Sequence, residues 1–86
     1  MKKSSVSYEY AVLGKTLRQA REKAGVTQVE LAARLKHTQS YLSKWERGGT
    51  RLDFVQVRRI CLELGVKFPA FVRAFELNLN KGRKEP

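Results

Sequence analysis

Two helix-capping signals lie close together in the middle of the chain, and they constrain the fold more than any other feature. Thr27 and Glu30 form a capping box, in which the hydroxyl accepts from the amide of Glu30 while the carboxylate accepts from the amide of Thr27. Thr38 is placed to cap a following helix, and Gly48 to end it. The stretch therefore predicts two short helices within about 28–46, joined by a tight turn.

The apolar residues of these two helices fall on one side. Leu31, Ala32 and Leu35 share a face of the first helix, and Leu42 and Trp45 are three residues apart on the second. The opposite side of the second helix is polar. This is the layout of a helix-turn-helix, which inserts its second helix into the major groove of DNA. A lone tryptophan in this position is expected in the core and not stacked on a base.

Further helices flank this pair on both sides. Apolar residues recur at steps of three and four over about 8–24, and Gly25 ends that helix. Asp53 with Gln56 repeats the capping signal for a fourth helix, and Pro69 suits the first turn of a fifth.

The organisation predicted from these signals is a single all-α domain. Its five helices would occupy residues 7–79, between a flexible polar arm at 1–6 and a disordered basic tail at 80–86. Cys61 lies among periodic apolar residues, so a small buried hydrophobe is expected rather than a reactive thiol. With one histidine, His37, and no paired carboxylates on a common face, we expect no metal site, no cofactor and no enzyme.

The charge of the chain points to an acidic partner. Its 86 residues include 18 Lys and Arg against 8 Asp and Glu, and the net charge is +10. Eight of the basic residues, against three acids, fall within 17–52, the segment that contains the motif. Nucleic acid and an anionic membrane surface both fit, but a capped, multi-helix pattern favours nucleic acid. With no signal peptide and no membrane-spanning apolar run, we expect a cytoplasmic protein.

Several groups of residues recur in a known order and spacing over about 8–75. They are Leu17-Arg18-x-x-Arg21 with Gly25-Val26-Thr27-Gln28-x-x-Leu31-Ala32, then Ser40-x-Leu42-Ser43-Lys44-Trp45-Glu46-x-Gly48, then Leu52-Asp53 leading to Leu64-Gly65-Val66. This ordered set resembles the XRE family of helix-turn-helix regulators, the Cro and repressor class. The resemblance implies a lambda-repressor-like fold and a DNA-binding regulator of transcription. It also implies a nucleoid-associated protein of bacterial or phage origin.

The outward face of the second motif helix, at its start and one turn along, holds the candidates for reading base edges. They are Gln39, Ser40, Ser43 and Lys44. Glutamine can pair bidentately with adenine, lysine can donate to guanine, and serine can bond to several bases. These positions form one contiguous patch at helical spacing. The alternative interpretation is an ordinary solvated face.

Residues around that face are candidates for phosphate contacts, which give affinity without sequence information. The family resemblance implies that Gln28 contacts a phosphate and braces the first residue of the recognition helix, and a helix amino terminus also favours an anion. The other candidates are Arg21, Lys36, Tyr41, Arg47, Thr50 and Arg51. For Tyr41 two alternatives stay open, a contact with a thymine methyl group or a place at the edge of the core.

The resemblance also implies a partly buried ion pair between Arg21 and Glu46, which would tie the first helix to the end of the recognition helix. Such a pair fixes geometry more reliably than it adds stability. One departure from the family is Lys36, which stands in the turn where the family usually has glycine. A left-handed lysine costs on the order of 1 kcal/mol, so either this lysine adopts that conformation or the turn takes a slightly different path.

The fifth helix contains more apolar residues than one short terminal helix needs. We expect a homodimer formed through Phe68, Phe71, Val72, Phe75 and Leu79. A two-fold dimer would present two recognition helices to major grooves about 34 Å apart. The alternative is that these residues close the core of the monomer.

The function predicted from the sequence is sequence-specific binding of double-stranded DNA, at a two-fold symmetric operator, by a transcriptional regulator. Repression by occluding a promoter is the expected mode, since occupancy itself would be the regulatory act. The alternative is an antitoxin, which would bind a toxin protein and autoregulate its operon.

Overall fold

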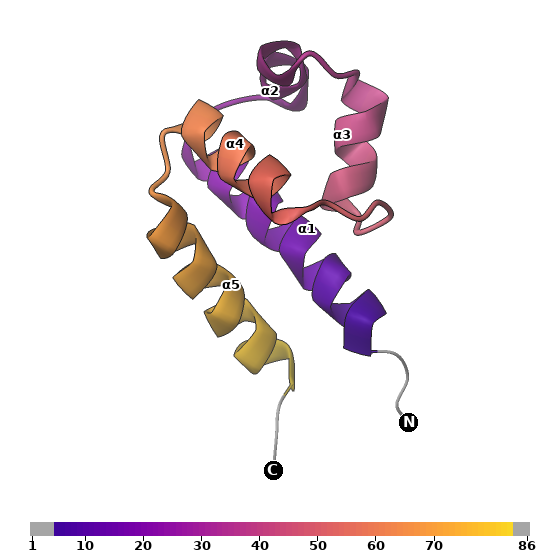
Figure 1. Cartoon of the computed structure of the whole chain (residues 1–86), viewed down its shortest axis with the longest axis vertical. Coiled ribbons are helices and arrows are strands. Elements are labelled where there is room, and N and C mark those ends of the chain that lie inside the picture. Colours follow the sequence, from indigo (N-terminus) through magenta and orange to yellow (C-terminus); the bar gives the residue numbers. More distant parts are fainter. Residues whose placement is uncertain (1–4, 84–86) are drawn as a thin grey trace.

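Five helices follow one another along residues 5–83, the part of the chain that this computed structural model describes, and no strand occurs among them (Figure 1). Their bounds are α1 Ser5–Lys23, α2 Gln28–Leu35, α3 Gln39–Glu46, α4 Phe54–Leu64 and α5 Phe68–Arg83. The prediction of an all-α, five-helix fold is therefore confirmed.

Local capping signals determine where the middle helices begin. Thr27 Oγ1 accepts from the amide of Glu30 over 3.1 Å, and Glu30 Oε1 accepts from the amide of Thr27 over 2.9 Å. The hydrogen bond from the Thr27 amide lowers the pKa of the Glu30 carboxyl from its ordinary value, because it favours the charged form. Thr38 caps α3 through the amide of Tyr41. The predicted starts of both helices are confirmed.

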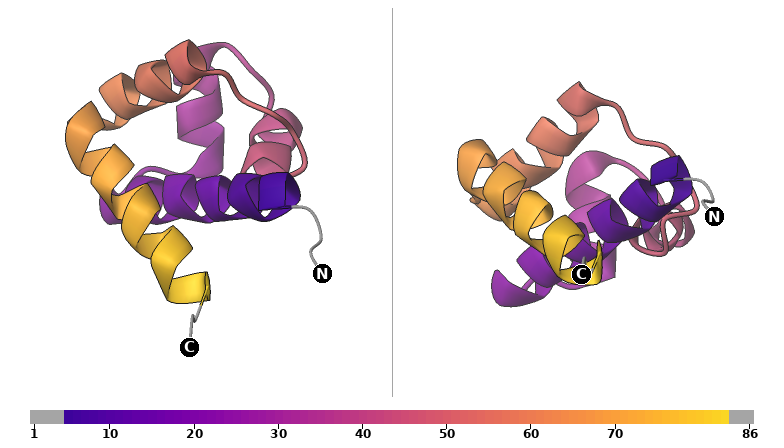
Figure 2. Two further views of the ribbon diagram at one scale, coloured as in Figure 1. Left: turned by 60° about the horizontal axis from the view of Figure 1, so that its bottom comes forward. Right: turned by 90° about the horizontal axis from the view of Figure 1, so that it is seen from below.

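The helices surround a common interior (Figure 2). Buried apolar side chains from all five helices fill it. Leu42 of α3 and Ile60 of α4 are almost completely buried there, in one cluster with Leu17 of α1. Trp45 is only 3% exposed, which confirms that it belongs to the core. Helix α3 has only eight residues, too few for a stable isolated helix, so packing of Leu42 and Trp45 must hold it in place.

Helices α1 and α5 lie side by side and antiparallel, so that the start of α1 meets the end of α5 (Figures 1 and 2). Tyr8 donates its hydroxyl proton to the carbonyl oxygen of Leu79 over 3.1 Å. In the middle of the pair, Asn78 Nδ2 donates to the hydroxyl of the buried Thr16 over 2.9 Å. These polar contacts fix the register of the terminal helix against the first one.

Both predicted ends of the domain need correction. Helix α5 continues through residues 80–83, which the sequence assigns to a disordered tail, and α1 begins at Ser5, within the predicted arm. The reason is tertiary: Leu79 is buried and held by Tyr8, so the last helical turn continues from an anchored residue. The rest of the predicted arm and tail, residues 1–4 and 84–86, lies outside the described part of the chain.

The set of residues predicted to form a dimer interface is also partly wrong. Phe71 and Leu79 are 3% and 7% exposed, because α5 turns them toward the core of the monomer. Phe68 and Phe75 are half-buried, and only Val72 of the predicted set is exposed. The alternative, that these residues close the core, therefore holds for Phe71 and Leu79.

Cys61 is buried within the same core, at 1% exposure. Burial raises the pKa of its thiol to about 11, because the apolar surroundings disfavour the thiolate. A protonated, inaccessible thiol is unreactive, and Cys61 acts as a small apolar side chain as the sequence predicts.

Gly14 offers a test of the contact between α1 and α3. A Cβ atom at this position would lie against the carbonyl oxygen of Trp45 and 2.7 Å from that of Glu46. Replacing glycine by alanine ordinarily stabilises a helix interior. Gly14→Ala should instead lower the free energy of unfolding by about 1–3 kcal/mol, because the added methyl group overpacks the contact with α3. Gly49→Ala is the control, because its Cβ would meet nothing closer than 3.5 Å. Urea denaturation of both variants measures the difference, and equal stability would contradict the contact.

Candidate nucleic-acid interface

The turn between α2 and α3 places the two motif helices. Lys36 adopts the left-handed conformation, with φ 61° and ψ 42°, so of the two alternatives for this departure from glycine the chain uses the strained lysine. The amide of Lys36 donates to the carbonyl of Ala33 over 3.2 Å, and that of His37 donates to Ala32 over 2.9 Å. The last turn of α2 is thereby closed, and Thr38 starts α3 directly afterwards.

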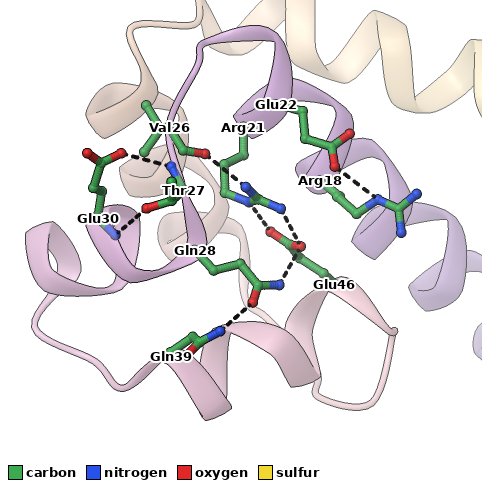
Figure 3. Close-up of polar contacts among 9 residues, drawn as sticks. All are labelled: Arg18, Arg21, Glu22, Val26, Thr27, Gln28, Glu30, Gln39 and Glu46. Carbon is green, nitrogen blue, oxygen red and sulfur yellow. Dashed lines mark hydrogen bonds and ion pairs between the residues drawn. The ribbon is translucent and has the colours of Figure 1, made fainter.

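A buried ion pair joins α1 to the end of α3 (Figure 3). Arg21 Nε lies 2.7 Å from Glu46 Oε2 and Nη2 lies 3.1 Å from Oε1, so the pair is bidentate. Arg21 Nη1 also donates to the carbonyl oxygen of Val26 over 2.8 Å. The hydrogen bond to the Glu46 carboxylate raises the pKa of Arg21 above its ordinary value. Each of the three nitrogens of the Arg21 guanidinium is thus engaged, two by Glu46 and one by Val26.

Two glutamines extend this pair toward the surface (Figure 3). Gln28 Nε2 donates to Glu46 Oε1 over 2.9 Å, and Gln39 Nε2 donates to Gln28 Oε1 over 3.1 Å. Because a carboxylate can only accept, Glu46 fixes which end of the Gln28 amide faces inward, and Gln28 in turn orients Gln39. The outer amide keeps its oxygen and one N–H free of these contacts.

The predicted base-reading residues share the exposed side of α3. Gln39, Ser40 and Lys44 are exposed, and Ser43 is half-buried. Arg47, which follows the helix as its C-cap, donates from Nη1 to Ser43 Oγ over 2.6 Å. This contact was not predicted; its sequence signal is the spacing of four residues, which places both side chains on one face.

The residues predicted to contact DNA phosphates differ in their exposure and in their existing contacts. Lys36 and Arg51 are exposed, and the guanidinium of Arg51 lies 5.5 Å from the ring centroid of Tyr10, a cation–π contact that sequence reasoning missed. Thr50 is half-buried in the loop after α3. Arg21, by contrast, is only 8% exposed and is committed to Glu46, which disfavours direct contact with a phosphate.

Tyr41 belongs to an aromatic cluster at the edge of the core. Its ring centroid lies 4.8 Å from that of His37 and 5.3 Å from that of Trp45, and the rings are tilted or edge-on. Tyr41 therefore lies at the edge of the core, which is one of the alternatives left open for it. Its side chain is only half-buried and keeps part of its surface exposed.

Within residues 5–83, no group of three or more His, Cys, Asp or Glu is placed to hold a metal ion. None of the helices in that range has the length and apolar character needed to cross a membrane.

Comparison with known proteins adds to this geometry. A family model described as helix-turn-helix matches residues 17–71, which contain the capped pair, the ion pair and the glutamines. The chain belongs to the XRE-type helix-turn-helix family. No curated protein matches the chain.

Solved structures of two regulators are similar to this XRE-type chain. One is the clp gene regulator ClgR from Corynebacterium glutamicum, with 28% identity and a TM-score of 0.76 over 81% of this chain and 90% of that one. The other is a mutant of the restriction-modification controller protein C.Esp1396I, with 21% identity and a TM-score of 0.78 over 84% and 96%. This XRE-type protein thus has a lambda-repressor-like fold and is a DNA-binding regulator of transcription.

The contribution of the Arg21–Glu46 pair to the stability of this XRE-type protein can be compared with that of an exposed ion pair within α1. Arg18 and Glu22 lie 3.8 Å apart with more than half of each side chain exposed, and such a pair contributes little. Glu46→Ala leaves Arg21 buried without its partner and should lower the free energy of unfolding by about 3–5 kcal/mol. Arg18→Ala should change it by less than about 0.5 kcal/mol. Thermal melts compare them, and equal melting temperatures would contradict the role assigned to the buried pair.

Proposed function

We propose that this regulator binds a specific duplex operator and represses transcription by occluding a promoter. The observation that supports this most is the chain of hydrogen bonds from Glu46 through Gln28 to Gln39. An amide held in one orientation on an exposed helix is preorganised for a base edge, and preorganisation avoids the entropic cost of ordering a long side chain on binding. A glutamine that only faced solvent would not need hydrogen bonds that hold its amide in one orientation.

Gln39 reads adenine in this proposal. Its free carboxamide oxygen would accept from adenine N6, and its remaining N–H would donate to N7. Ser40, Ser43 and Lys44 would contact neighbouring bases from the same face of α3. Ser43 accepts from Arg47, so its hydroxyl proton stays available to donate to a base.

The phosphate backbone would be held by residues on both sides of this face. They are Gln28, Lys36, Tyr41, Arg47, Thr50 and Arg51. Gln28 opens α2, where free amides and the helix dipole favour an anion. Arg21 acts in this proposal by holding Glu46 and not as a phosphate contact itself. The net charge of +10 would steer the protein to DNA before the specific contacts form.

A homodimer completes the proposal, through a surface that we name the α4–α5 apolar patch: Phe54, Leu62, Phe68 and Val72. Phe54 is 72% exposed, and its ring lies 5.0 Å from that of Phe68, edge to face. An exposed aromatic side chain packed against a half-buried one in this way is typical of protein contacts. A two-fold dimer formed there would suit a two-fold operator. The same patch could instead hold a toxin, which is the alternative function.

Selection of bound sequences from random duplex DNA at about 0.15 M salt tests the operator proposal. Wild-type protein should enrich a two-fold symmetric site with half-sites about one helical turn apart. Gln39→Ala should lose preference at one adenine in each half-site, at a cost of about 1–3 kcal/mol. If the wild type enriches no sequence, binding is non-specific and the proposal fails.

Two leucines of equal exposure test the dimer. Leu62 and Leu77 are each 58% exposed, but only Leu62 belongs to the α4–α5 apolar patch. Leu62→Glu should weaken self-association at least tenfold, because it places a charge in the buried centre of the contact, while Leu77→Glu should not. Sedimentation equilibrium measures both. A monomeric wild type would contradict the dimer, and copurification of a small toxic protein would favour the antitoxin.

A further inference from the structure

The loop between α3 and α4 runs along the first half of α1 (Figure 2). A Cβ atom at Gly48 would lie 2.7 Å from the Cα atom of Ala11 and 3.2 Å from the carbonyl oxygen of Tyr10. Only a residue without a side chain lets the loop lie this close to α1. Further along the loop Leu52 is buried in the core, at 6% exposure. The loop is therefore anchored on both sides of Arg51.

Tyr10 contacts the side chain of Arg51 as well. Its ring is half-buried on α1, and the guanidinium carbon of Arg51 lies over it, 5.5 Å from the ring centroid. A guanidinium in this place is attracted by the negative face of the aromatic ring. The contact occupies none of the five N–H donors of the arginine.

The charge of Arg51 is otherwise uncompensated. Within residues 5–83, its guanidinium makes no ion pair and donates no hydrogen bond. An exposed arginine that binds a phosphate ordinarily loses side-chain entropy in doing so. Here the ring already restrains the side chain while all of its donors stay available. This combination suits a bidentate contact with a phosphate.

The loop also begins beside the exposed face of α3. The amide of Gly49 donates to the carbonyl oxygen of Lys44 over 2.8 Å, and a Cβ atom at Gly49 would lie 3.9 Å from Lys44 Cγ. Lys44 is one of the residues proposed to contact bases. A helix in the major groove has a phosphate backbone on each side, so a loop that starts at its edge is close to phosphates.

We propose that Tyr10 is a positioning residue for DNA binding, whose ring holds the guanidinium of Arg51 ready for a phosphate of the DNA backbone. Tyr10 lies outside residues 17–71, the part of the chain that matches the helix-turn-helix family. The first half of α1 would thus add to the interface a contact that the motif does not include. The inference rests on the proposed phosphate contact of Arg51. It does not depend on base reading by α3, because phosphate contacts carry no sequence information.

Fluorescence anisotropy with a labelled duplex, long enough for two half-sites, measures the effect. Tyr10→Leu should weaken binding about three- to tenfold, because Arg51 must then be ordered when DNA binds. Tyr10→Phe keeps the ring and should bind within about twofold of the wild type. An equal loss in both variants would show that the hydroxyl acts and not the ring, and would overturn the proposal.

The dependence on salt separates positioning from the loss of a charge. Arg51→Gln should lower the slope of log K against log salt concentration by about one, because one phosphate contact is lost. Tyr10→Leu keeps the charge and so should keep the wild-type slope. In the Arg51→Gln background, Tyr10→Leu should have no further effect on affinity. If it weakens binding there as much as in the wild type, Tyr10 acts through the fold and the proposal fails.

Tyr8 gives a matched control on the same helix. It is half-buried like Tyr10, but its hydroxyl donates to Leu79 of α5. Tyr8→Leu should therefore leave the affinity for DNA within about twofold of the wild type, at a temperature below the melting transitions of both variants. Equal weakening by Tyr8→Leu and Tyr10→Leu would mean a general effect of α1 and would overturn the role of Tyr10.

NMR spectra of the free protein test the contact without DNA. The side-chain protons of Arg51 should be shifted upfield by the ring in the wild type and in Tyr10→Phe, and this shift should disappear in Tyr10→Leu. Absence of the shift from the wild type would overturn the proposal.

The binding outcomes separate this inference from the proposed function. If the wild type binds duplex DNA without sequence preference, the operator proposal fails, but the effect of Tyr10 is still measured. If it binds no duplex, or if Arg51→Gln binds as the wild type does, the phosphate contact of Arg51 fails and this inference fails with it. If Arg51→Gln weakens binding and Tyr10→Leu does not, only this inference is overturned.

Discussion

The carboxylate of Glu46 is the contact on which the arrangement of the DNA-facing helices depends. It receives two hydrogen bonds from Arg21 of α1 and one from Gln28 of α2, while it belongs to α3 itself. A single buried anion therefore sets the relative positions of three helices. Buried ion pairs are weak sources of net stability, because desolvation offsets their attraction, but removing one partner is costly. The pair thus favours this arrangement of the three helices over others in which Arg21 or Glu46 would be buried without its partner.

In the proposed function, the same carboxylate would link folding to recognition. Because Glu46 can only accept hydrogen bonds, the amide of Gln28 must face it with nitrogen, and its oxygen must then face Gln39. The orientation of an exposed side chain is in this way determined by a buried one. Any change that removes the charge of Glu46 should alter recognition as well as stability, even where the fold survives.

Local signals in the sequence predicted the middle of the molecule well. The caps at Thr27, Thr38 and Asp53 depend only on residues within one turn, and all three helices begin where the caps place them. The ion pair of Arg21 with Glu46 follows from the family resemblance. The ends of the chain could not be predicted in this way, because α5 extends to Arg83 only through contacts with Tyr8 and other residues far away in sequence. A buried threonine paired with a distant asparagine has no local signature.

The burial of α5 shows the same limit for function. Apolar content alone assigned Phe71 and Leu79 to a partner, but both are buried in the monomer. The exposed apolar residues instead include Phe54 and Leu62 of α4, beside Val72 of α5 itself. Counting apolar residues cannot separate a face that closes a domain from one that joins two. To tell these two kinds of face apart, one needs the angle at which α5 crosses α1. The turn at Gly65 and the hydrogen bonds of Asn78 determine this angle together. Which apolar residues stay exposed to a partner therefore depends on how α5 packs on the rest of the chain, and local sequence signals do not predict this packing.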